Sequence, residues 1–130
     1  KPQQSTLDGI PLALPGLTRA LKLQAKAAKV GFDWPTVEYV YDKIAEEIDE
    51  LRSAPDDKKA EEVGDLLFAV ANVARHMGID PEAALRSANA KFDRRFAHIE
   101  ARLAEAGRAP ADSTLEEMDS LWEEAKSLGK

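Results

Sequence analysis

The 130-residue sequence contains no cysteine, which excludes disulfide bonds, thiol catalysis, iron–sulfur clusters and cysteine-based zinc sites. It also lacks any apolar run approaching the ~20 residues that a membrane-spanning helix needs. The longest apolar stretch, 66–74, is interrupted by Asn72 and followed by Arg75 and His76. No secretory signal is visible at the start. We therefore expect a cytoplasmic protein with no membrane partner.

An excess of positive charge is also missing. Lysine and arginine together number 18, against 24 aspartates and glutamates, which gives a net charge of −6. Proteins that bind nucleic acid without sequence preference need a basic face. We therefore expect no nucleic-acid partner, whereas a phosphorylated ligand can still bind if a metal cation mediates the contact.

The sequence is rich in apolar and charged residues, which make up 44% and 32% of the chain and are typical of a globular domain. Apolar residues recur at helical spacing, and no alternating strand pattern is present. We predict an all-α fold in which short loops join antiparallel helices. The predicted helices span 15–29, 36–53, 57–77, 81–106 and 115–128.

The first fourteen residues have little pattern and are broken by proline and glycine. We predict that 1–14 is a tail or linker and that 15–130 is one domain. Because the chain begins at Lys1 rather than Met, we expect it to be a piece of a longer, two-domain protein.

Several helix ends can be predicted from capping residues. Pro15 suits a first helical position, and Asp80 suits the cap of the fourth helix after Gly78 ends the third. Ser113 and Glu116 have the spacing of a capping box for the last helix.

Wide apolar stripes on the second to fifth helices, together with alanine-rich faces, favour close association of two chains. We therefore expect a homodimer. The stripe of the third helix comprises Val63, Leu66, Leu67, Val70, Val73, Ala74 and Met77.

Acidic residues follow one edge of two neighbouring stripes. Glu47 and Glu50 flank the stripe of the second helix, and Glu62 and Asp65 flank the same-handed edge of the third. An antiparallel hairpin would bring both pairs to one rim, whereas Glu46 falls on the far face. Converging carboxylates repel one another unless cations are present, and Mg²⁺ is the usual ion beside phosphates.

The acidic residues also allow other interpretations. A solvated acidic helix face with i,i+4 support remains open. Other metal sites fit worse, because neither His76 nor His98 has a glutamate three residues earlier and no EF-hand loop is present.

These motifs together resemble the MazG nucleoside triphosphate pyrophosphohydrolases. The resemblance rests on Glu46-Glu47-x-x-Glu50 with Glu62-x-x-Asp65, and it extends over about 14–128. Further matching segments are 30–34, 64–69, 89–96 and 115–118.

The resemblance implies an all-α dimer in which two chains complete the helical bundle. It also implies hydrolysis of nucleoside triphosphates to monophosphate and pyrophosphate with Mg²⁺, for which Mn²⁺ is a possible substitute. It implies Glu47, Glu50, Glu62 and Asp65 as metal ligands, and Glu46 as a residue that tunes them. The positions that contact the substrate in the family match Lys58, Lys91, Arg95, Trp122 and Lys126.

Simpler roles for these residues stay open. Lys91 and Arg95 also fit ordinary solvated charges, and Trp122 also fits a core aromatic. Phe32 and Trp34 suit either stacking on a base or packing in a dimer core.

The functional hypothesis is a Mg²⁺-dependent nucleoside triphosphate pyrophosphohydrolase in which water attacks the α-phosphate. The alternatives are a narrow dUTP or modified-nucleotide pyrophosphatase and a non-catalytic helical dimerisation module.

Overall fold

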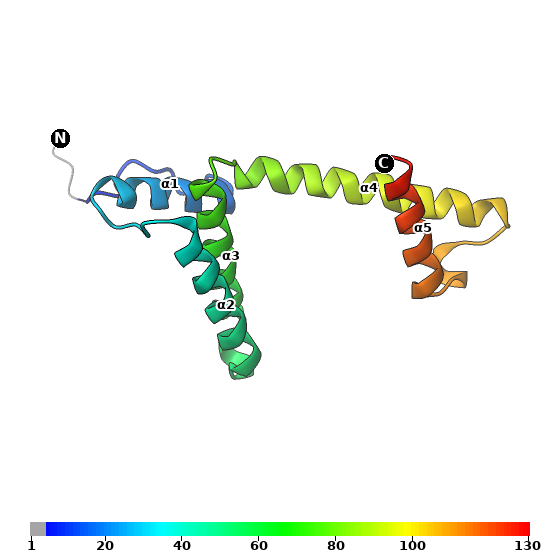
Figure 1. The fold of residues 1–130 in the computed structure, drawn as a ribbon, viewed down its shortest axis with the longest axis horizontal. Coiled ribbons are helices and arrows are strands. Elements are labelled where there is room, and N and C mark those ends of the chain that lie inside the picture. The colour runs from blue at the N-terminus through cyan, green and yellow to red at the C-terminus, as the bar shows by residue number, and fades with distance from the viewer. Residues whose placement is uncertain (1–4) are drawn as a thin grey trace. The chain divides into compact units, whose positions relative to one another are not determined.

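The computed structural model describes residues 5–130, and every regular element in that range is helical (Figure 1). The predicted all-α class is therefore confirmed. No helix within 5–130 combines the length and apolarity needed to cross a bilayer. The elements are α1 (Gly16–Lys29), α2 (Val37–Ser53), η1 (Asp56–Lys58), α3 (Lys59–His76), α4 (Pro81–Glu105), η2 (Pro110–Asp112) and α5 (Leu115–Ser127).

The observed bounds follow the predicted ones closely, with differences of one or two residues at the starts and ends of helices. The short 3₁₀ turn η1 takes up the residues before Lys59 that we assigned to the third helix. Pro15 is the residue before α1 rather than its first residue. Residues 5–15 contain turns but no helix, and the first four residues of the predicted tail lie outside the described range.

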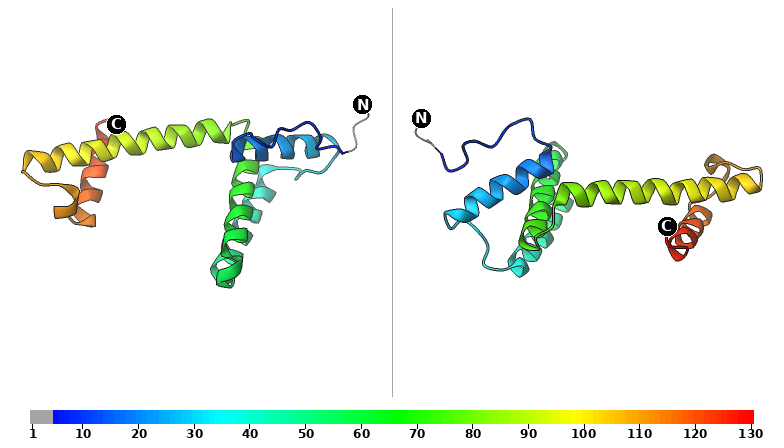
Figure 2. Two further views of the ribbon diagram at one scale, coloured as in Figure 1. Left: turned by 180° about the vertical axis from the view of Figure 1, so that it is seen from behind. Right: turned by 90° about the horizontal axis from the view of Figure 1, so that it is seen from above.

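The chain divides into two compact units, Lys1–Ala84 and Leu85–Lys130. In the first unit, α2 and α3 lie side by side as an antiparallel hairpin, and α1 packs against α3 (Figures 1 and 2). Val40 of α2 and the small residues Ala69 and Ala71 of α3 are buried. Small buried side chains let helix backbones approach closely, so this hairpin has a narrow, well-defined core.

One apolar row on α3 is not covered. Val63, Leu67 and Val70 of α3, and Met77 directly after its end, are between 42 and 52% exposed. All four belong to the stripe predicted for this helix. Their spacing places them along one side of the helix. The apolar pattern of α3 is therefore only partly explained by packing within the chain.

In the second unit, α4 and α5 are joined through partly buried polar contacts. His98 of α4 is buried, and its Nε2 lies 2.8 Å from Oε1 of Glu124 on α5. Arg102 Nε donates to the same oxygen at 2.8 Å. Ile99 and Leu103 of α4 are buried beside them. The Glu124 carboxylate of α5 thus binds both His98 and Arg102 of α4 and links the two helices.

The predicted cap of α4 is confirmed. Asp80 Oδ1 accepts hydrogen bonds from the backbone N–H groups of Glu82 and Ala83, at 3.0 and 3.3 Å. Gly78 has a φ of +70°, a left-handed conformation that glycine adopts without steric cost, and it ends the preceding helix.

The predicted capping box of α5 is wrong by one residue. Thr114, not Ser113, is the N-cap, and its hydroxyl accepts from the backbone N–H of Glu117 at 3.1 Å. The Ser113 hydroxyl instead donates to the Glu117 carboxylate, which also pairs with Arg108. A competing side-chain acceptor therefore removes Ser113 from the capping role.

The Arg108–Glu117 pair predicts a pH-dependent stability. Hydrogen bonds from Arg108 and then Ser113 lower the pKa of Glu117 from an ordinary 4.5 to about 2. A carboxyl with a lowered pKa stabilises the fold above its unfolded-state pKa, and that contribution is lost as the pH falls from about 4.5 toward about 2. We expect Glu117→Gln to lower the urea midpoint at pH 7 and to match the wild type near pH 2. A difference that does not change with pH would contradict this account.

Candidate metal centre

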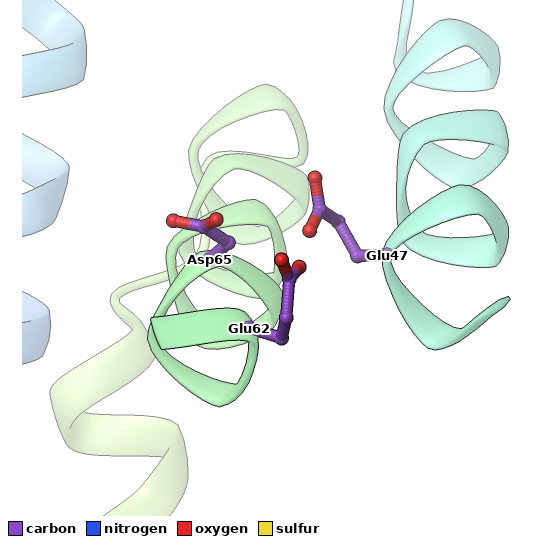
Figure 3. A group of neighbouring side chains, drawn as sticks. All are labelled: Glu47, Glu62 and Asp65. Atoms are coloured by element: carbon purple, nitrogen blue, oxygen red, sulfur yellow. The ribbon is translucent and has the colours of Figure 1, made fainter. Parts of the chain in front are cut away.

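Three carboxylates from α2 and α3 converge in the first unit. One oxygen each from Glu47, Glu62 and Asp65 can be chosen so that all three lie within 4.8 Å of one another. Figure 3 shows Glu47 extending from α2 toward Glu62 and Asp65 of α3. The two α3 residues are three apart and therefore lie on the same side of that helix. The antiparallel hairpin thus brings together acidic residues that are distant in sequence.

One member of this group is buried to a degree that is unusual for an acidic side chain. Glu47 is only 4% exposed, Glu62 is half-buried and Asp65 is exposed. Oε2 of Glu47 and Oε2 of Glu62 are both buried, and neither has a hydrogen-bond partner among residues 5–130. Buried carboxylate oxygens without donors are costly. A hard divalent cation, which prefers oxygen ligands, fits this donor set.

Lys43 partly offsets the negative charge. Its Nζ lies 3.0 Å from Oε1 of Glu47 and 3.4 Å from Oε1 of Glu46, one turn away on α2. The contact with Glu47 raises the pKa of Lys43, so the ammonium form is favoured. The sequence analysis missed this residue, although the i,i+4 spacing of Lys43 and Glu47 was a signal that could have found it.

The other two predicted acidic residues of α2 lie outside this group of three. The pKa of Glu50 is raised, chiefly by the charge of Glu47, then by burial and by the charge of Glu62. Glu50 therefore lies within the negative field of the group. Glu46 is exposed and bonded to Lys43.

A cavity of about 320 Å³ adjoins the carboxylates. It offers a space next to Glu47 and Asp65 with one cation in its wall and apolar surface around it. A cavity of this kind suits a ligand that has both a charged and an uncharged part. Its lining residues are Trp34, Val40, Lys43, Glu47, Asp65, Phe68, Ala69 and Asn72.

The predicted substrate-contacting residues fall in both units. Lys58 is exposed in η1, in the turn of the hairpin that carries the carboxylates. Arg95 and Trp122 belong to the second unit and lie together, with the guanidinium carbon 5.2 Å from the centre of the indole ring. Trp122 also packs at 5.5 Å against the ring of Phe92. Lys91 of α4 and Lys126 of α5 are exposed.

The comparison with protein families gives one match. The model of the MazG nucleotide pyrophosphohydrolase domain matches residues 35–100, which include α2, α3 and the acidic residues Glu46, Glu47, Glu50, Glu62 and Asp65.

Individual proteins are similar over nearly the whole chain. The chain is 48% identical to a nucleoside triphosphate pyrophosphohydrolase of Escherichia coli (strain K12), over 97% of its length and 50% of that protein. It is 41% identical to the nucleoside triphosphate pyrophosphohydrolase/pyrophosphatase MazG of Thermotoga maritima, with the same coverage. It is 50% identical to the uncharacterized protein YabN of Bacillus subtilis, over 95% of the chain and 26% of that protein.

The chain thus spans half or less of the length of these relatives. The family model, in contrast, covers about half of the chain itself and includes the carboxylate hairpin. The chain therefore belongs to the MazG nucleotide pyrophosphohydrolase domain family.

Proposed function

We propose that this chain hydrolyses nucleoside triphosphates to the monophosphate and pyrophosphate in the presence of Mg²⁺. The observation that carries the proposal is the convergence of Glu47, Glu62 and Asp65, with two buried oxygens lacking partners, beside a cavity. The names of the Escherichia coli and Thermotoga maritima relatives support the same reaction class.

The metal ligands in this proposal are Glu47, Glu50, Glu62 and Asp65. Glu47 is buried on α2, and Glu62 and Asp65 are held at one-turn spacing on α3, so the hairpin brings three of the four proposed ligands together before a metal binds. When bound, Mg²⁺ supplies charge neutralisation for the phosphates and makes a water molecule more acidic. Mn²⁺ prefers similar oxygen ligands and is expected to substitute. Glu46 shares Lys43 with Glu47 and thereby influences the charge of the group.

The reaction breaks the bond between the α-phosphorus and the oxygen that bridges to the β-phosphorus. The oxygen of water forms the new bond to the α-phosphorus, the water loses a proton, and the bridging oxygen leaves with pyrophosphate. The chain has no cysteine, so a thiol nucleophile is excluded and direct attack by water is the simplest route.

Cationic residues have a separate role in the proposal. A nucleoside triphosphate carries several negative charges, and Lys58, Lys91, Arg95 and Lys126 are proposed to offset them. Arginine can bind two phosphate oxygens at once, whereas lysine provides a mobile point charge. Trp122 is proposed to hold Arg95 in position through the cation–π contact. A cytoplasmic location stays a prediction.

A second copy of this chain is the proposed partner. The exposed row Val63, Leu67 and Val70 on α3 is an apolar surface that two copies can bury against each other. A homodimer would then cover the part of the α3 stripe that the single chain leaves in contact with water.

Hydrolysis in ¹⁸O-labelled water tests the proposed reaction directly. With Mg²⁺ present, we expect the label in the nucleoside monophosphate and unlabelled pyrophosphate as the second product. A nucleotide panel that includes dUTP separates broad from narrow substrate choice. Diphosphate plus phosphate as products, or the label in pyrophosphate, would contradict attack at the α-phosphate, and no hydrolysis at all would favour a dimerisation module.

Amide variants test the ligands in the same assay. Glu62→Gln and Asp65→Asn each remove a negative ligand, so we expect kcat to fall about 100-fold or more. Asp49→Asn is the matched control, because Asp49 is an exposed carboxylate on α2 outside the group and its loss should leave the rate unchanged. Near-wild-type rates for both ligand variants would refute the assignment.

Light scattering on a size-exclusion column tests the dimer. We expect the wild type to elute at twice the chain mass, and Leu67→Glu to elute as a monomer because a charge would be buried at the interface. Leu12→Glu introduces the same charge at a leucine that is 85% exposed before α1 and should leave the dimer intact. A monomeric wild type, or a dimeric Leu67→Glu variant, would rule out this surface.

A further inference from the structure

A second and larger cavity, of about 510 Å³, adjoins the one at the carboxylates within the first unit. The two cavities share Trp34, Phe68 and Asn72 in their walls. A ligand whose charged end lies at Glu47 and Asp65 therefore has room for its uncharged end in the larger cavity. The metal-centre proposal uses only the first of these spaces.

The larger cavity has mainly apolar walls with flat aromatic surfaces. Leu23 and Ala27 of α1 line one side, and Phe32 and Trp34 line another. The ring of Trp34 is stacked on that of Tyr39, with the ring centres 6.0 Å apart and the planes 5° from parallel. An indole ring offers a flat surface that is suited to packing against a planar heterocycle.

One buried amide in this cavity has an unused acceptor. Gln24 of α1 is 8% exposed, and its Nε2 donates to the backbone carbonyl of Phe68 on α3 at 2.9 Å. Because a carbonyl can only accept, this bond fixes which end of the amide is nitrogen. The remaining atom, Oε1, is buried and has no partner among the described residues. A ligand with an N–H group would satisfy it.

Asn72 adds a hydrogen-bond donor to the cavity wall. Its Oδ1 accepts from Arg75 Nε at 3.0 Å, which leaves its Nδ2 to act as a donor in the wall shared by both cavities. The cavity wall therefore contains both an acceptor and a donor. Each nucleobase carries an N–H group and an acceptor on its Watson–Crick edge, so a planar base matches both the walls and the polar atoms.

We propose that this cavity holds the nucleobase of the triphosphate and that Gln24 Oε1 accepts a hydrogen bond from an N–H group of the base. This inference rests on the proposed function, because it assigns the uncharged half of the same substrate. Gln24 would then be a specificity-determining residue, since a buried acceptor left without a donor disfavours any base that cannot supply one. Trp34 and Phe32 would supply the stacking surfaces.

Matched substrate pairs test the assignment. UTP is compared with N3-methyl-UTP, and ATP with N6,N6-dimethyl-ATP, because each methylated partner lacks the N–H group of its parent. We expect the wild type to prefer the unmodified nucleotides by about tenfold or more in kcat/KM. Gln24→Leu should reduce that preference to near one, and the control Lys22→Leu, at an exposed position on the same helix, should keep it.

The preference is a ratio within one enzyme, so a partly unfolded variant lowers both rates and leaves the ratio interpretable. A wild type without the preference, or a Gln24→Leu variant that keeps it, would overturn the base assignment while triphosphate hydrolysis itself stands.

If the wild type hydrolyses no triphosphate, the proposed function fails and the cavity is tested by saturation-transfer NMR with uridine and adenosine. Binding to the wild type that Gln24→Leu abolishes would support a base site. No binding, or binding that is unchanged in the variant, would overturn it.

Discussion

Mutual repulsion among three converging carboxylates, one of them buried, is the constraint on which this molecule depends. Glu47, Glu62 and Asp65 lie close together because an antiparallel hairpin brings the acidic edge of α2 to that of α3. Lys43 contacts only one of them, and Glu50 has a raised pKa in their field. A divalent cation bound between the three carboxylates, as proposed above, would supply a compensating charge in a small space.

The scaffold around the carboxylates explains how they are held. The buried Val40, Ala69 and Ala71 fix the helices of the first unit at close approach. Gln24 then ties α1 to α3 through the Phe68 carbonyl. As a result, the acidic group, the adjoining cavity and the aromatic residues of the 31–34 loop all belong to one unit. This arrangement links the proposed metal chemistry to a space of suitable size for the rest of a nucleotide.

Much of this organisation could be predicted from the sequence, because helical periodicity and capping residues act locally. The all-α class, the extents of the helices and the shared edge of Glu47, Glu62 and Asp65 follow from spacing alone. Other features depend on contacts between distant residues. The choice of Thr114 over Ser113 as a cap required knowing that Arg108 holds the Glu117 carboxylate. The pairing of Gln24 with Phe68 joins residues 44 apart, and no local pattern encodes it.

The central claim is that the cluster of Glu47, Glu62 and Asp65 binds a divalent cation. Titration with Mn²⁺, followed by electron paramagnetic resonance, tests this claim most directly. The account predicts that the wild type removes the signal of free Mn²⁺, that excess Mg²⁺ restores the signal, and that Glu47→Gln combined with Glu62→Gln prevents binding. A free Mn²⁺ signal that the wild type leaves unchanged, or that the double variant reduces equally, would contradict the account.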